Sequence, residues 1–175
     1  MKYYTIQNGS LLIAENEQAL TRFYDNVLPL PSDYNAEKYI VVNNELVLNP
    51  EWEEIQLNEA KEAKLKENEE KRDAFLVSGV LYKNILWDSD LEQKFNISVQ
   101  VNSMGDEETI TWVAMDGVTS LECTKADLLN IGALLTQMTA YVWQLKNPEI
   151  KTAIQEAKTV EEVEAISIDY SLTAL

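Results

Sequence analysis

The stretch TKADLLNIGALLTQMTAYVWQLK, residues 124–146, decides how the second half of the chain folds. Thr124 stands where a helix N-cap is needed, and Asp127 follows three residues later, as in a capping box. Asn147-Pro148 predicts the end of the helix, because the residue before a proline is disfavoured in the helical region. The apolar residues at alternating steps of three and four are Leu128, Ile131, Leu135, Met138, Val142 and Leu145. This spacing predicts one core helix over residues 124–146.

Short strands and helices are predicted on both sides of this helix, over residues 73–175. Phe75 and Val77 open a strand pattern, and Asp88-Ser89-Asp90 precedes a helical pattern that runs to Val101. Short strands are predicted over residues 75–82, with Gly79 at a bulge or turn, and over residues 85–87. A hairpin is predicted to pair residues 109–114 with 118–123, and shorter helices follow Asn147-Pro148 and Thr159. We therefore expect a C-terminal α+β domain of short β-hairpins packed on helices over 73–175.

Residues 1–50 predict a separate N-terminal β-hairpin module. Asn8-Gly9 and Asn43-Asn44 are turn pairs that tolerate left-handed backbone, and apolar or β-branched runs flank each of them. An amphipathic helical pattern covers residues 16–26, and Pro29 and Pro31 end it.

A polar connecting helix is predicted between the two parts, over residues 51–72, which are rich in Glu, Lys and Ala. Such a helix either bridges two modules through solvent or pairs along a thin apolar seam with another chain, which would produce self-association. The fold class predicted for the whole chain is α+β.

The charge balance excludes two classes of partner. Thirty acidic and fourteen basic side chains give a formal net charge of −16, which repels phosphate backbones and anionic membranes. Imitation of DNA would need dense, regular rows of carboxylates, which the acidic residues do not form. No apolar run approaches the roughly 18 residues that a membrane span needs. We expect no nucleic-acid or membrane partner.

The chain contains no histidine and one cysteine. The missing histidine excludes Ser-His-Asp and Cys-His catalysis and imidazole zinc sites, and a thiolate zinc site needs several cysteines. A single cysteine and an N-terminus without a signal-peptide pattern predict a reducing compartment, the cytoplasm. No catalytic residue, cofactor or metal site is expected.

Three groups of residues allow a chemical reading beside a structural one. Asp88 and Asp90 are spaced to hold Mg²⁺ or Mn²⁺, but both also stand where helix caps are needed. Cys123 precedes a helix N-terminus, which lowers thiol pKa values, but no histidine is present to act as its base. The acidic run at 106–108 lacks the spaced ligands of a calcium loop. We interpret these groups as helix caps, an inert thiol and a solvated turn.

Large aromatic residues are the candidates for binding a protein partner, because tryptophan and tyrosine anchor many interfaces. Tyr39, Val41 and Trp52 would belong to an N-terminal arm whose exposed strand pairs with a partner. Trp87 and Trp112, on the C-terminal hairpins, are the alternative anchors. Tryptophan also anchors protein cores and stacks on sugars.

From Phe75 onward, the chain resembles a domain of formally unknown function found at the C-terminal end of many phage and prophage proteins. The segment from Pro31 to Pro50 resembles the front half of such proteins. The matching motifs are Gly79-Val80-Leu81-Tyr82, Trp87-Asp88-Ser89-Asp90, Trp112 with Asp116-Gly117, Thr124-Lys125-Ala126-Asp127 and Thr159-Val160-Glu161-Glu162-Val163.

These relatives are associated with tail-fibre genes and are assigned as tail-fibre assembly proteins or chaperones. The resemblance implies a non-enzymatic protein that binds the phage tail-fibre polypeptide and assists its folding, trimerisation or attachment. Its expected location is the cytoplasm of the infected bacterial host, with retention in the virion as an alternative. A permanent structural component of the fibre or baseplate is the second expectation, and an enzyme acting on surface sugars is the third.

Overall fold

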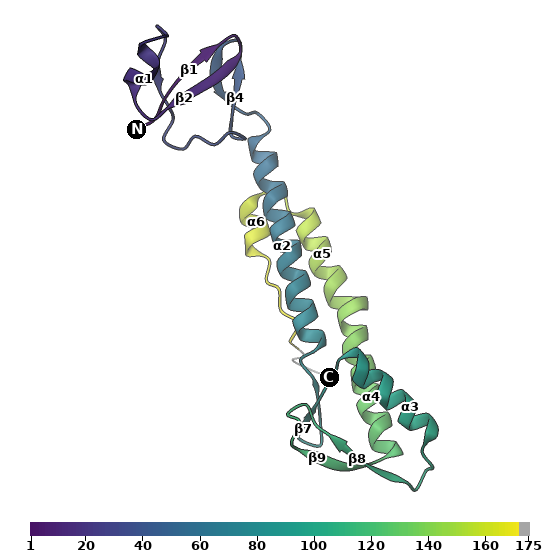
Figure 1. Cartoon of the computed structure of the whole chain (residues 1–175). Coiled ribbons are helices and arrows are strands. Elements are labelled where there is room, and N and C mark those ends of the chain that lie inside the picture. The colour runs from purple at the N-terminus through teal and green to yellow at the C-terminus, as the bar shows by residue number, and fades with distance from the viewer. Residues whose placement is uncertain (172–175) are drawn as a thin grey trace. The chain divides into compact units, whose positions relative to one another are not determined.

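The computed structural model of the chain describes residues 1–171 and confirms the α+β class (Figure 1). The chain forms two compact units, of which the first comprises residues 1–58 and the second begins at Glu59. No helix in residues 1–171 combines the length and the apolar character that a membrane crossing requires.

The first unit contains the two predicted hairpins and one short helix. Asn8, Gly9, Asn43 and Asn44 all have positive φ, which gives the two tight turns. The elements are β1 (Tyr3–Gln7), β2 (Ser10–Ala14), α1 (Glu17–Thr21), β3 (Leu28–Pro29), β4 (Tyr39–Val42) and β5 (Glu45–Leu48). β1 lies between β2 and β3 in one sheet, and β4 pairs with β5 in another. All these pairings are antiparallel.

Helix α1 is shorter than the predicted 16–26. Asn16 caps it by accepting a hydrogen bond from the backbone N–H of Ala19 at 3.0 Å. Leu20 is the one buried residue of the helix, and Phe23, just beyond its end, is 76% exposed. Without a second buried apolar position, nothing anchors further turns.

Helix α2 (Trp52–Leu76) starts in the first unit and continues into the second. The predicted boundary at residue 72 and the predicted strand at Phe75 are wrong. Phe75 is helical, and its ring centroid lies 6.0 Å from that of Tyr170 and 6.3 Å from that of Tyr141. Burial against these rings extends the helix beyond its polar part.

The second unit contains two further hairpins and the remaining helices. Its elements are β6 (Val80–Tyr82), β7 (Ile85–Trp87), α3 (Leu91–Ser103), β8 (Thr109–Val113), β9 (Ser120–Thr124), α4 (Lys125–Ala140), the π-helix η1 (Tyr141–Lys146), α5 (Asn147–Glu156) and α6 (Val160–Ala165). β6 pairs with β7, and β8 pairs with β9 in the predicted hairpin. In Figure 1, α3 lies beside α4, next to the β8–β9 hairpin. The predicted caps Asp90 and Thr124 are confirmed, the latter as a complete capping box with Asp127.

The prediction that Asn147-Pro148 ends the central helix is wrong. Asn147 keeps helical angles, with φ −66° and ψ −43°, so the chain passes from α4 through η1 into α5 without a break. Pro148 lacks an N–H, and in a continuous α-helix its ring would clash with the carbonyl four residues earlier. The wider π turn, in which the N–H of Asn147 donates to the carbonyl of Val142, accommodates it.

This π turn shifts the helical phase and divides the apolar stripe. The predicted stripe residues up to the π turn are buried, namely Leu128, Ile131, Leu135, Met138 and Val142. Leu145, the last residue of the predicted stripe, is 59% exposed. The next buried positions are Asn147, Ile150 and Ile154.

The interior of the second unit consists of two apolar clusters. The first joins the hairpins, α3 and α4 around Trp87, Ile97 and Ile131. The second joins η1, α5 and the segment after α6 around Val142 and Ile154. Phe75 contacts both clusters, so the end of α2 connects them.

Candidate partner-binding surfaces

The β4–β5 hairpin is apolar on both faces and is only partly covered. Every residue of its two strands except Glu45 is apolar or aromatic, yet none is buried. Val42 is 42% exposed and Leu48 is 55% exposed. A partly covered two-stranded ribbon of this composition is marginally stable in water and is typical of a surface that another polypeptide covers.

Both edges of this hairpin are unpaired within residues 1–171, because its sheet contains only β4 and β5. Val42 lies opposite Glu45 beside a two-residue turn, and the backbone N–H of Asn49 donates to the carbonyl of Lys38 at 2.7 Å. In an antiparallel pair, hydrogen-bonded and non-hydrogen-bonded residue pairs alternate along the strands. Val41 and Leu46 form a non-hydrogen-bonded pair, so their backbone N–H and C=O groups point outwards from the ribbon. They are available to an added strand.

The first unit has little interior of its own. Among residues 1–58, only Thr5 and Leu20 are buried, and the hydroxyl of Thr5 has no hydrogen-bond partner in residues 1–171. So small a core contributes little free energy of folding.

Tyr39 is engaged inside the first unit. Its hydroxyl donates to Oδ1 of Asp33 at 3.0 Å, and its ring stacks on Tyr34 with 6.0 Å between centroids. The hydrogen bond to Asp33 raises the pKa of the Tyr39 phenol. Lys38 also pairs with Asp33. Tyr39 and Trp52 are both half-buried, and Val41 lies with Tyr39 on one face of β4.

Trp87 and Trp112 lie in the core rather than on the surface. Trp87 has no exposed area, and its indole N–H donates to the backbone carbonyl of Tyr82 at 3.1 Å. Trp112 is 9% exposed. Neither side chain is available as a surface anchor, because each fills the cluster between the hairpins and α4.

A groove of about 640 Å³ runs between α3 and the α4–η1 helix. Its lining includes small residues of α4, namely Gly132, Ala133, Thr136 and Ala140, together with Leu129 and Trp143. Gly132 faces Ile97 of α3, since a Cβ built on Gly132 would lie 3.5 Å from Cγ2 of Ile97. Lys94 is the one charged residue in the lining.

An exposed apolar ridge lies on α3, the helix that forms one wall of this groove. Leu91, Phe95 and Val99 recur every four residues and are 82%, 66% and 46% exposed. Trp143 is 47% exposed, and the guanidinium carbon of Arg72 lies 4.8 Å from the centre of its ring. This surface was not predicted from the sequence. Residues 91, 95 and 99 are apolar at steps of four, in addition to the buried Ile97, and this second apolar spacing is the pattern that could have revealed the surface.

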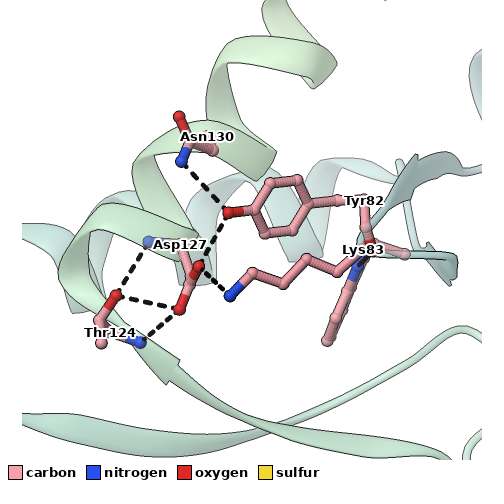
Figure 2. Close-up of polar contacts among 6 residues, drawn as sticks. Tyr82, Lys83, Thr124, Asp127 and Asn130 are labelled. Carbon is pink, nitrogen blue, oxygen red and sulfur yellow. Dashed lines mark hydrogen bonds and ion pairs between the residues drawn. The ribbon is translucent and has the colours of Figure 1, made fainter.

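A polar cluster joins the β6–β7 turn to the start of α4 (Figure 2). Oδ1 of Asp127 accepts a hydrogen bond from the Tyr82 hydroxyl at 2.8 Å and lies 2.7 Å from Nζ of Lys83. Oδ2 accepts from the backbone N–H of Thr124 at 3.1 Å. Asn130 Nδ2 in turn donates to the Tyr82 hydroxyl at 3.2 Å.

The Lys83 hydrogen bond, with that from Thr124, holds the pKa of the Asp127 carboxyl well below its usual range. Both carboxylate oxygens are occupied by partners from the chain itself. We interpret the cluster as a structural tie between a hairpin and a helix, and sequence reasoning had found only its Thr124–Asp127 part.

Of the two aspartates interpreted as caps, Asp90 caps α3 by accepting from the backbone N–H of Gln93 at 2.7 Å. Asp88 does not cap this helix. Within residues 1–171, no group of His, Cys, Asp and Glu side chains is arranged to hold a metal ion. Cys123 has no exposed area, and burial raises the pKa of its thiol, which makes it unreactive.

Comparison with known proteins assigns the second unit to a family. Residues 59–171 match the family model described as Domain of unknown function (DUF4376), so the chain belongs to this family. The match begins at the residue where the second compact unit begins. No curated protein and no solved structure matches the chain.

Proposed function

We propose that this protein is a tail-fibre assembly protein, which binds the fibre polypeptide of a phage or prophage and assists its folding, trimerisation or attachment without catalysing a reaction. The observation that carries the proposal is the apolar, only partly covered β4–β5 hairpin, whose two edges are unpaired within residues 1–171. The resemblance of the sequence to proteins associated with tail-fibre genes supports it. Membership of the DUF4376 family assigns no activity by itself.

The mode of binding follows from the hairpin. A strand of the fibre polypeptide would add to a free edge through main-chain hydrogen bonds, which require no exact match of side chains. Apolar side chains of the fibre would cover Val41, Leu46 and Leu48. An unassembled fibre chain exposes strand edges and apolar surface, and both promote aggregation until the trimer forms.

The net charge of −16 suits this role, because an acidic complex repels other copies of itself and stays in solution. The proposed site of action is the cytoplasm of the infected bacterium, where the fibre polypeptide is synthesised.

The test is co-expression of the full chain with the tail-fibre polypeptide from the same phage or prophage. The expected result is that the two proteins purify together and that the fibre is soluble only in the presence of this chain. Changing Val42 and Leu48 together to lysine should abolish both effects, because charged side chains would have to be buried at the interface. Both residues are already exposed, and Val42 lies opposite Glu45, so the hairpin itself should tolerate the change.

The matched control is Leu81→Lys, which alters a leucine that is 64% exposed on β6 in the second unit. It should leave the co-purification unchanged. If the fibre is equally soluble without this chain, the proposed function fails. If the Val42 and Leu48 variant still binds the fibre, the hairpin is not the binding surface.

A further inference from the structure

We propose that two copies of this chain associate through the face formed by α3, α4 and η1, with the α3 ridge of each copy inserted in the α3–α4 groove of the other. The α3 ridge is Leu91, Phe95 and Val99, as described above. This inference concerns a different surface from the β4–β5 hairpin and does not depend on the proposed function.

The distribution of charge is the first argument for a second copy. Residues 95–105 and 128–145 contain no Asp, Glu, Lys or Arg, although a quarter of the chain is charged. These two segments are most of α3 and of the α4–η1 helix, which line the groove together. A copy with a net charge of −16 is repelled by another copy over most surfaces. Apart from Glu92 and Lys94 near the start of α3, this face carries no charged residue, so two copies can meet there with few carboxylates brought together. Charged residues are depleted in the same way at interface cores.

The shape of the face is the second argument. A two-fold symmetric interface requires one patch to be complementary to itself, so that a protrusion and a recess occur on the same surface. Here the exposed ridge lies on α3, the helix that forms one wall of a groove whose lining includes Gly132, Ala133, Thr136 and Ala140. Small side chains in the lining allow a neighbouring helix to approach closely. In the proposed dimer, Phe95 of each copy covers Ala133 of the other.

Helix α2, the segment predicted to self-associate, is largely engaged within its own chain beyond residue 59. Its apolar residues Leu65, Phe75 and Leu76 pack in the second cluster. Lys61 and Lys71 donate to the backbone carbonyls of Gln155 and Ile168 at 2.9 and 3.3 Å. The α3–α4 face therefore offers more uncovered apolar surface than α2 for pairing.

The experiment measures the mass of the full chain by sedimentation velocity and light scattering, from low micromolar to submillimolar concentration. The wild-type chain should approach twice the chain mass as the concentration rises. Phe95→Lys and Ala133→Glu should each return it to the mass of one chain, because each buries an unpaired charge in the interface. Both positions are exposed in the single copy, so neither change disturbs its core.

Phe23→Lys is the matched control, because Phe23 is 76% exposed, does not line the groove and lies in the first unit. It should leave the dimer intact. Circular dichroism of each variant verifies that the helices are retained, so that loss of the dimer is not loss of the fold.

Mixing the two monomeric variants provides the decisive measurement. In a ridge-into-groove dimer of the two variants, the lysine introduced at position 95 of one chain would meet the glutamate introduced at position 133 of the other. The symmetry-related contact would pair the unchanged Phe95 with the unchanged Ala133. The mixture should therefore regain the dimer. The proposal is overturned if the wild-type chain keeps the mass of one copy at submillimolar concentration, if the single variants remain dimeric, or if the mixture does not associate.

Discussion

Asn68 and Asn147 are joined by a hydrogen bond in the interior of the second unit, where Nδ2 of Asn68 donates to Oδ1 of Asn147 at 2.9 Å. The hydroxyl of Tyr170 donates to Oδ1 of Asn68 at 2.7 Å. The three side chains are buried and come from α2, from the start of α5 and from the segment after α6. A buried polar group without a partner is costly, so this network favours one relative placement of the three segments.

Asn68→Ala should lower the free energy of unfolding by about 1–3 kcal/mol for the polar groups left without partners. Urea unfolding followed by circular dichroism measures the loss. Asn58→Ala, an exposed position on the same helix, is the matched control and should change stability by less than about 0.5 kcal/mol. Equal effects of the two substitutions would show that the network contributes nothing.

Deletion of Gln144 should lower the free energy of unfolding by about 3 kcal/mol, because Pro148 would then stand in a continuous α-helix. Removing one residue from η1 rewinds the segment as an α-helix in which Val142 and Asn147 are four residues apart, so Asn147, Ile150 and Ile154 stay on the buried face. Pro148→Ala in the deletion variant should recover most of the loss, which urea unfolding measures. Gln144→Ala keeps the chain length and changes an exposed side chain, so it should be almost neutral. A deletion variant as stable as the wild type would mean that the π turn is not needed to accommodate Pro148.

Met138→Ala should cost about 2–5 kcal/mol, because Met138 has no exposed area. Leu145→Ala should cost less than about 0.5 kcal/mol, although Met138 and Leu145 belong to the same apolar spacing in the sequence. Thermal and urea unfolding of the two variants compare these losses. Similar losses would contradict the exposure of Leu145 that the π turn produces.

Asp127 should make the protein sensitive to acid. Its carboxyl pKa is depressed in the folded state, so the folded chain binds this proton more weakly than the unfolded chain. The stabilisation is therefore complete above the unfolded value of about 3.9 and is lost as the pH falls from there towards the folded pKa. Asp127→Asn should be less stable near neutral pH and should lose less stability than the wild type between about pH 6 and pH 3.

Asp106→Asn is the control for this titration, because the Asp106 side chain is 91% exposed. It should retain the wild-type dependence on pH. Other carboxyls with depressed pKa values, such as Glu67 and Asp116, are present in all three proteins, so their contribution cancels in the comparison. Parallel pH curves for wild type and Asp127→Asn would contradict the assignment.

Local sequence signals predicted the hairpins and caps because their causes lie within a few residues. Asn43-Asn44 adopts positive φ on its own preference, and Thr124 and Asp127 satisfy each other across three residues. The extent of α2 was not predictable in this way. Phe75 is helical because it packs against Tyr141 and Tyr170, which are distant in the sequence.

The candidate surfaces were predicted only in part. The β4 strand was identified because its apolar run stands out locally, but the exposure of that run depends on the absence of a covering element in the first unit. Trp87 and Trp112 were named as alternative partner anchors by residue type, with a place in the core left open, and the fold of the hairpins over α4 buries them. The α3–α4 groove depends on two helices meeting at Gly132 and Ile97, which no single helical pattern reveals.

The burial of Cys123 gives the protein an internal reporter of its own motions. The thiol lies on β9 against α4, has no exposed area and is the only sulfhydryl group in the chain. A thiol reagent can reach it only when the β8–β9 hairpin separates from the helix, so the labelling rate under native conditions measures how often that opening occurs. The same measurement repeated with a bound partner would show whether binding at a distant surface slows the opening of this core, without any engineered label.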